Sequence, residues 1–315
     1  MNPIPGLTPT FNPPIPGPKL DTFVFYLKTH KTGSTTLQNI LFRFAERHDL
    51  KVALPGGSES SNEKYRFRYG TRFKKENINL DNGHNIIAHH MRLDNPELEK
   101  SVIDEIYSTA KDSREIPFKI TIMREPVSLF KSSFDYFKQS YKPFTSAGNL
   151  TNFLKSPEKF YKKSKKDCES CTKFGRNCVS FDLGFSADEE DPDEISKMVK
   201  TVDDSFDFVL ILEYFEESLI LLKHKMSEKY EIQWTYEDIL FAKLNVGKER
   251  GESNFQENEA IINWLSSDSV LYDHFNNSLW NEIEQYGVKN MDREKRILAG
   301  KQATIQNTGL PRGRS

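Results

Sequence analysis

The residues at positions 28–36 combine positive charge, hydroxyl groups and a glycine in a short turn between a predicted strand and a predicted helix. The turn contains Lys28, His30, Lys31, Thr32, Gly33, Ser34, Thr35 and Thr36. Backbone N–H groups at the start of a helix bind phosphate groups, and a glycine lets the backbone approach a ligand closely. The turn therefore predicts an anion site, and the alternative is an ordinary strand–helix turn with a Ser/Thr cap.

A second set of anion-binding side chains follows a later predicted strand. Arg124 stands directly after residues 118–123, and Pro126 is well placed in the first turn of a helix. The arginine offers a planar fork that suits phosphate, and Ser132 lies eight residues further on. We expect both to converge on one anion, with the alternative that Arg124 pairs with Glu125 or with the end of a helix.

Two adjacent histidines, His89 and His90, end the predicted strand at residues 85–89. Successive strand residues point to opposite faces, so one of the two rings is expected to face the site. A histidine that titrates near neutral pH is suited to remove a proton from a hydroxyl group. The alternative is a structural histidine at a strand end.

The elements that must position these residues alternate along the chain. Strands are predicted at residues 22–27, 85–89, 118–123 and 207–212, and helices follow at 37–44, 98–110, 127–137 and 219–226. This alternation, with nearly continuous apolar strands, predicts an α/β fold whose mostly parallel sheet has helices on both faces.

Three segments depart from the alternation. Residues 1–20 are rich in proline and are expected to form an extended stem or linker. Residues 141–206 contain lysine-rich and acidic runs and are expected to form an insertion near the mouth of the site. The main domain is predicted at 21–288, and residues 289–315 are polar and expected to be a flexible tail.

Composition limits the classes of function. The net charge of −2 gives no case for nucleic-acid binding, and no apolar run is long enough for a transmembrane helix. Cys168, Cys171 and Cys178 lack a fourth zinc ligand nearby, so we expect no metal. A disulfide with one remaining thiol and three free thiols both stay open. Two glycosylation sequons, at Asn149 and Asn276, are compatible with the secretory pathway.

Several segments together resemble one family of enzymes. They are LKTHKTGSTTLQNILFR, IIAHHMRL, ITIMREPVSLFKSSFDYF, SFDLGF and DFVLILEYFEESLILL, with a weaker echo in EDILFAKLN. Their order and spacing run through most of residues 22–250 and resemble the galactose-3-O-sulfotransferase family, which includes galactosylceramide sulfotransferase. The resemblance implies a P-loop-like sulfotransferase fold, although the spacing of nucleotide triphosphatases is absent.

The resemblance also implies the reaction. The donor would be PAPS (3′-phosphoadenosine 5′-phosphosulfate), and the acceptor the 3-hydroxyl of a β-galactose on a glycolipid or glycan. Lys31 and the loop at 32–36 would hold the 5′-phosphosulfate, and Arg124 and Ser132 the 3′-phosphate. Lys31 would stabilise the leaving phosphate. His89 or His90 would be the base, and the count back from Asp94 favours His89 slightly. No metal is needed for this chemistry.

Family members are usually Golgi membrane proteins, so the resemblance implies a Golgi location. No anchor is found in this chain, so membrane association would depend on a missing N-terminal segment or on a lipid substrate. Two alternatives remain open: an inactive protein of the same fold that binds PAP or a glycan, and a sulfotransferase for another sugar position. The acceptor, the choice between the two histidines, the cysteine pairing and the oligomeric state also remain open.

Overall fold

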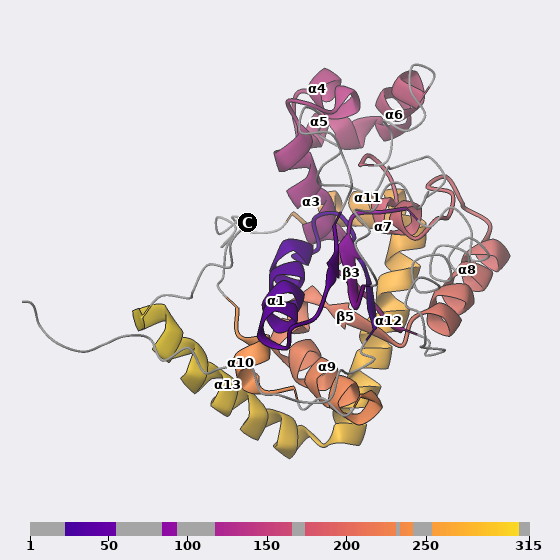
Figure 1. The fold of residues 1–315 in the computed structure, drawn as a ribbon. Helices are drawn as coiled ribbons and strands as arrows, with labels where there is room; N and C mark the ends of the chain where they lie inside the picture. The colour runs from indigo at the N-terminus through magenta and orange to yellow at the C-terminus, as the bar shows by residue number, and fades with distance from the viewer. Residues whose placement is uncertain are drawn as a thin grey trace, which may run out of the picture.

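A parallel sheet forms the centre of the molecule. The computed structural model describes residues 23–54, 84–92, 117–165, 174–230, 234–241 and 254–308. Within these residues the sheet has five strands in the order β2-β3-β1-β4-β5 (Figure 1). The strands are β1 (Val24–Leu27), β2 (Val52–Ala53), β3 (Ile86–His89), β4 (Phe118–Met123) and β5 (Phe208–Ile211). All four pairings are parallel, which confirms the predicted α/β class.

The strands are mostly apolar because both faces of the sheet are covered. All four residues of β1, the central strand, are buried. Its register places Leu27 beside His89 of β3 on one side and beside Thr121 of β4 on the other. The carboxyl ends of β1, β3 and β4 therefore lie at one edge, where parallel sheets bind ligands.

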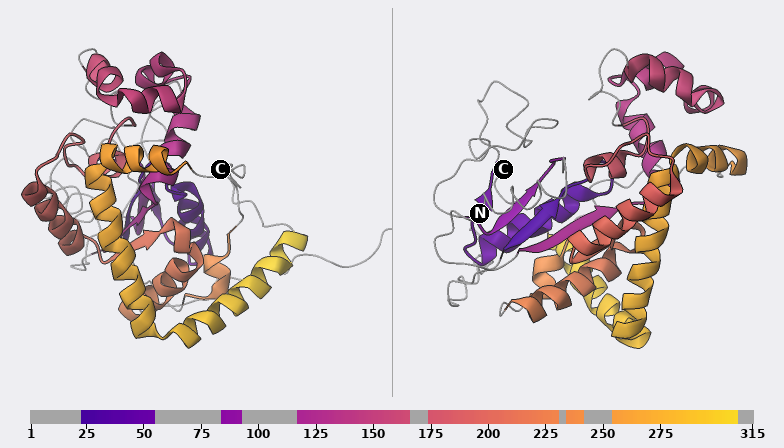
Figure 2. Two further views of the ribbon diagram at one scale, coloured as in Figure 1. Left: turned by 180° about the vertical axis from the view of Figure 1, so that it is seen from behind. Right: turned by 90° about the vertical axis from the view of Figure 1, so that its right-hand side faces the viewer.

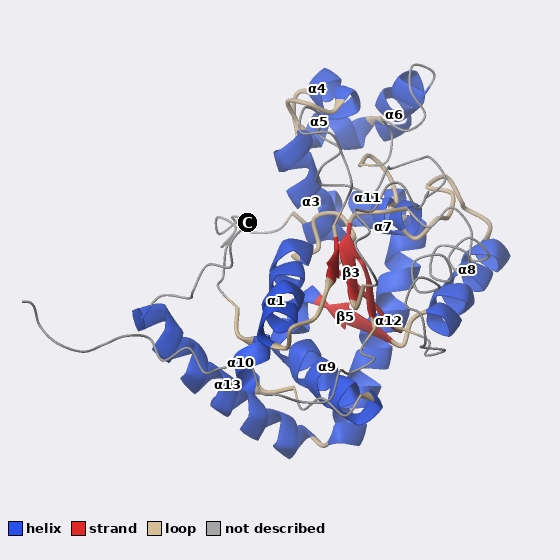
Figure 3. Cartoon of the chain, in the orientation of Figure 1, coloured by secondary structure: helices blue, strands red, loops and turns tan. Residues whose placement is uncertain are grey.

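Helices cover both faces of the sheet, as predicted (Figure 3). One face carries α1 (Ser34–Arg47), α9 (Phe215–Lys229) and α10 (Tyr236–Ile239), and the other carries α7 (Cys178–Asp182), α8 (Pro192–Ser205) and α12 (Ser266–Tyr286). Right-handed crossovers explain why α1 and α8 lie on opposite faces, because the chain moves in opposite directions along the sheet from β1 to β2 and from β4 to β5.

A second helical group stands at the carboxyl end of the strands. It contains α3 (Pro126–Phe137), α4 (Lys142–Ala147), α5 (Leu150–Lys155), α6 (Pro157–Lys165) and α11 (Phe255–Trp264). These helices pack around an aromatic cluster that includes Phe130, Phe144, Phe153 and Trp264. The segment 141–206 thus begins in this group and continues through α7 and α8, whose apolar residues join the main core.

The expectation of a flexible tail from residue 289 is wrong for most of that segment. Residues Val288–Thr308 form the helix α13, which makes a V with α12 (Figure 2). Met291 and Leu298 are buried against the main core, and Lys223 of α9 pairs with Glu294 at 3.1 Å. A narrow apolar stripe on a polar helix is enough to hold it in place.

Several predicted features lie outside the described residues. These are the stem at 1–20, the helix at 98–110, the last residues of the tail, Cys168 and Cys171. Cys178 lies in α7 as a buried free thiol. Among the helices that the structure describes, none is long and apolar enough to cross a membrane.

Candidate functional site

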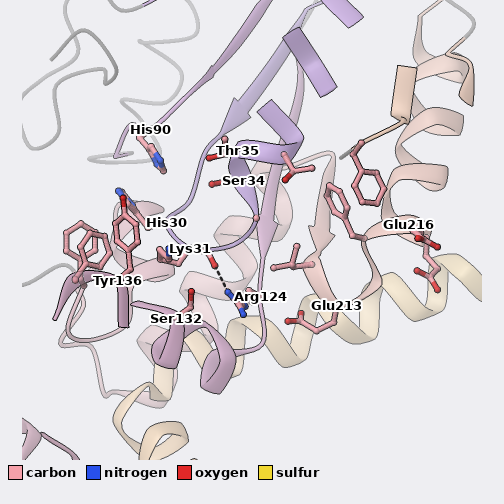
Figure 4. A pocket seen from close by; sticks show the side chains of 18 of the residues that line it. His30, Lys31, Ser34, Thr35, His90, Arg124, Ser132, Tyr136, Glu213 and Glu216 are labelled. Carbon is pink, nitrogen blue, oxygen red and sulfur yellow. Dashed lines mark hydrogen bonds between the residues drawn. The ribbon is translucent and has the colours of Figure 1, made fainter. Parts of the chain in front are cut away.

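A cavity of about 870 Å³ lies at the carboxyl edge of the sheet (Figure 4). This volume is within the range of about 300–1,000 Å³ that is usual for small-molecule sites. Nine of the predicted site residues line it: His30, Lys31, Gly33, Ser34, Thr35, Thr36, His90, Arg124 and Ser132. The structure therefore brings together the turn after β1, the end of β3, the end of β4 and helix α3.

The turn after β1 has a backbone shape that requires glycine at one position. Gly33 precedes α1 with φ of 72°, in the left-handed region. A Cβ atom added there would lie 2.5 Å from Cδ1 of Leu212, so a larger residue would need that side chain to shift as well as a left-handed backbone. Lys31 also has a positive φ, of 61°. The turn exposes the N-terminus of α1 to the cavity, as an anion site requires.

Hydrogen bonds from hydroxyl groups on the buried side of the turn stabilise this backbone shape. The Thr29 hydroxyl donates to the Ile122 carbonyl at 2.6 Å and contacts the Thr32 hydroxyl at 2.8 Å. The Ser34 hydroxyl donates to the Thr29 carbonyl at 2.7 Å. The side chain of Thr32, which is fully buried, therefore supports the turn and does not line the cavity.

Lys28 also lies beneath the turn rather than in the cavity. Its Nζ donates to Oε1 of Gln38 at 2.7 Å, and its side chain is buried. Burial lowers the pKa of Lys28 to about 8. Its contribution is therefore to fix the turn against α1.

Two cations, Lys31 and Arg124, meet at the cavity wall. Nη1 of Arg124 donates to the Lys31 carbonyl at 3.1 Å, the bond drawn in Figure 4. Nζ of Lys31 lies 3.8 Å from the centre of the Tyr136 ring. Burial, and then the charge of Arg124, lowers the pKa of Lys31. Glu125 caps α3 by accepting from the backbone N–H groups of residues 127 and 128 at 2.9 and 2.7 Å.

The two histidines occupy different environments. His89, which the motif count favours, lies outside the cavity lining and is buried against α1, 3.3 Å from the Gln38 amide. Burial, and then Lys28, lowers the pKa of His89 to about 4. His90 lines the cavity, and its Nδ1 donates to the Lys28 carbonyl at 2.8 Å. This bond leaves Nε2 as the nitrogen of His90 that can accept a proton.

The cavity has further lining residues that the sequence did not single out. They are Tyr136, Phe137, Phe174, Leu212, Glu213, Phe215, Glu216, Glu217, Phe241 and Lys295. Glu213 lies two residues after β5, and this position near a strand end could have identified it from the sequence. Phe174 comes from the segment 141–206, and Lys295 of α13 pairs with Glu217 at 2.5 Å. Phe174 and Lys295 reach the cavity through contacts between segments far apart in the sequence, so no local pattern predicts them.

The fold and the cavity define an α/β protein with a cavity at the carboxyl edge of a parallel sheet, where Lys31 and Arg124 lie beside the N-terminus of α1. Among the described residues, no group of three or more His, Cys, Asp or Glu side chains could hold a metal ion.

Comparison with known proteins places the chain in a family. The family described as galactose-3-O-sulfotransferase matches residues 4–314. Galactose-3-O-sulfotransferase 3 of Mus musculus is 35% identical over 87% of this chain and 60% of its own length, and that of Homo sapiens is 34% identical over 93% and 65%. Galactosylceramide sulfotransferase of Homo sapiens is 35% identical over 87% and 61%. The chain belongs to the galactose-3-O-sulfotransferase family, and it spans about three fifths of the length of these curated relatives.

Proposed function

We propose that this protein transfers the sulfuryl group of PAPS to the 3-hydroxyl of a β-galactose on a glycolipid or glycan. The observation that carries the proposal is the meeting of Lys31, Arg124 and His90 in one cavity at the N-terminus of α1. The relatives carry galactose or galactosylceramide sulfotransferase in their names, which supports the same substrate class.

In this proposal the donor occupies the cationic wall of the cavity. The turn at 31–36 holds the 5′-phosphosulfate through Lys31, the Thr35 and Thr36 hydroxyl groups and the N–H groups of α1. Arg124 and Ser132 hold the 3′-phosphate, for which the arginine fork is suited. Lys28 and Thr32 act indirectly, because they fix the shape of the turn.

His90 is the general base of the proposed reaction. Nε2 of His90 takes the proton of the galactose hydroxyl as its oxygen attacks sulfur. A new bond forms between sulfur and the sugar oxygen, the bond from sulfur to the 5′-phosphate oxygen breaks, and 3′,5′-ADP leaves. Lys31 and the N-terminus of α1 stabilise the charge that grows on the leaving oxygen. Positioning and electrostatics supply the catalysis, and no step needs a metal.

A panel of acceptors tests the proposal and identifies the acceptor. Sulfate transfer from labelled PAPS is measured to galactosylceramide, lactosylceramide, N-acetyllactosamine and desulfated heparan. We expect label on a galactose-terminated acceptor. Label on desulfated heparan alone would establish another sugar position. Stabilisation by PAP without transfer to any acceptor would indicate a binding protein, and loss of both would overturn the donor site.

We infer a Golgi location from the family as well. The sequons at Asn149 and Asn276 are compatible with passage through the secretory pathway. Microscopy of the tagged protein against a Golgi marker tests this inference, and a uniform cytosolic signal would contradict it.

A further inference from the structure

A buried carboxylate holds His30, the histidine within the anion-binding turn. Asp182, the last residue of α7, is almost fully buried and accepts a hydrogen bond from the His30 backbone N–H at 2.8 Å. Its carboxylate also contacts Nδ1 of His30, at 2.8 Å through Oδ2 and 3.1 Å through Oδ1. These contacts fix both the backbone and the ring of His30. Because Nδ1 is engaged by Asp182, proton exchange between this ring and the cavity must use Nε2.

The fixed ring of His30 lies against the proposed base. The rings of His30 and His90 stack with centres 4.2 Å apart and an angle of 18° between their planes. Figure 4 shows both rings side by side at one end of the cavity, and both line it. At this distance two positively charged imidazoles repel each other, so protonation of one ring opposes protonation of the other.

We propose that Asp182 and His30 form a positioning pair that retains a proton and thereby keeps the stacked His90 ring neutral and ready to accept one. The inference rests on the proposed function, because it assigns roles within the same reaction. The carboxylate of Asp182 accepts from the His30 N–H and contacts Nδ1 through both oxygens, so it favours the protonated form of the His30 ring, whose positive charge faces His90. A buried Asp–His pair without a shared proton would carry net negative charge, which burial disfavours. The pair therefore keeps its proton, and His90 is the acceptor.

Three other charged residues lie around the Asp182–His30 pair, and two of them are held by hydrogen bonds to α7. On the turn itself, Lys31 carries positive charge and lines the same cavity as both rings. Arg92, beyond the end of β3, donates to the Phe181 carbonyl of α7 at 3.0 Å. Asp268 of α12 accepts from the Ser180 N–H of α7 at 2.8 Å, and the pKa of Asp268 is raised by burial to about 6.

Three buried groups, His89, Lys28 and Cys178, complete the described surroundings of the pair. His89 lies beneath the turn with its pKa lowered to about 4 by burial and by Lys28, so that ring stays neutral near pH 7. Lys28 itself offers its carbonyl to His90, and burial lowers the pKa of its ammonium to about 8. The buried thiol of Cys178 in α7 has its pKa raised by burial, so it also stays neutral near pH 7. Among the described residues, the His30 ring of the Asp182–His30 pair is the titratable group that stacks directly on His90.

The direction in which the titration midpoint of His90 moves in Asp182→Asn tests the proposal. The histidine rings of the full chain are titrated by NMR in the wild type and in Asp182→Asn, and the signals are assigned with His30→Asn and His90→Asn. We expect the titration midpoint of His90 to rise by roughly half a pH unit or more in Asp182→Asn, because His30 then loses its proton more easily. The acid limb of the kcat/KM profile for sulfate transfer should move upward with it.

The other outcomes overturn the proposal. An acid limb that moves downward in Asp182→Asn would make His30 itself the proton acceptor, and an unmoved His90 midpoint would make Asp182 a structural residue only. If Asp182→Asn does not fold, His30→Asn carries the same expected rise for His90. Asp238→Asn is the matched control, because Asp238 is also a buried aspartate beside a histidine, His48, but lies away from the cavity. The NMR result needs no sulfate transfer, so it separates failure of this pair from failure of the proposed function.

Discussion

Lys31 is the residue on which the proposed chemistry depends most. Its ammonium group lies over the Tyr136 ring at the cavity wall, next to Arg124. The residue types of the turn predict an anion site, and the structure places Lys31 in the lining of the cavity. The residue types were not enough to separate residues that line the cavity from those that support it, because Lys28 and Thr32 differ from their neighbours only in the direction of their side chains.

Replacement of Lys31 by alanine should reduce turnover on the order of a hundredfold or more, because the charge on the leaving oxygen loses its main stabilising group. The measurement is kcat for sulfate transfer at saturating PAPS. Lys200→Ala is the control, since Lys200 is an exposed lysine of α8 that pairs with Asp204. Near-normal turnover of Lys31→Ala would contradict the assignment of the turn.

Arg124→Ala should weaken PAP binding by about 10–100-fold, as expected for the loss of charge-assisted hydrogen bonds of about 1.5–3 kcal/mol. Binding of 5′-AMP, which lacks the 3′-phosphate, should change little, and calorimetry with both ligands measures the difference. Equal losses for PAP and AMP would show that Arg124 acts through its bond to the Lys31 carbonyl instead.

At the scale of elements, the sequence predicted the sheet well and the long-range contacts poorly. The strand at 118–123 is observed with the same bounds, because a short apolar run after a polar segment has few other solutions. Asp182 reaches His30 across 152 positions of the chain, and no local pattern encodes such a contact. The count back from Asp94 favours His89, whereas His89 lies against α1 and His90 lines the cavity; the choice of His90 as base is part of the proposed function.

Gly33→Ala should lower stability and abolish PAP binding, because the left-handed backbone costs about 1–2 kcal/mol and the new Cβ meets Leu212. Gly148→Ala is the matched control: its φ is 77°, and a Cβ there meets nothing within 4 Å. Thermal unfolding and PAP titration compare the two. Addition of Leu212→Ala should restore part of the loss in Gly33→Ala, and equal effects of the two glycine variants would contradict the close fit.

Helix α13 was missed because most of its residues are polar, although Met291, Glu294 and Leu298 recur every three or four positions and are buried. Leu298→Ala should lower the free energy of unfolding by about 2–4 kcal/mol through loss of packing. Ile297→Ala, at a neighbouring position that is 39% exposed, should cost about 1 kcal/mol or less. Urea unfolding of both variants measures the difference, and equal small losses would support a loosely held tail.

At the scale of the whole molecule, the cavity is assembled from nearly the full length of the described chain. The turn after β1 supplies the proposed phosphosulfate site, α3 and Phe174 supply one end, and α9 and Lys295 of α13 supply the other. The segment 141–206 is therefore part of the site and the core, with Asp182 and Phe174 as its contributions. Family membership, with the match over residues 4–314, agrees with a site that needs the whole fold.

The most direct test of the central claim compares two acceptors that differ by one methyl group. Label transfer from PAPS is measured to a galactose-terminated acceptor and to the same acceptor methylated at the galactose 3-hydroxyl. The proposed function predicts transfer to the first and none to the second. Equal transfer to both would contradict 3-O-sulfation, and no transfer to either, together with no binding of PAP, would contradict the donor site itself.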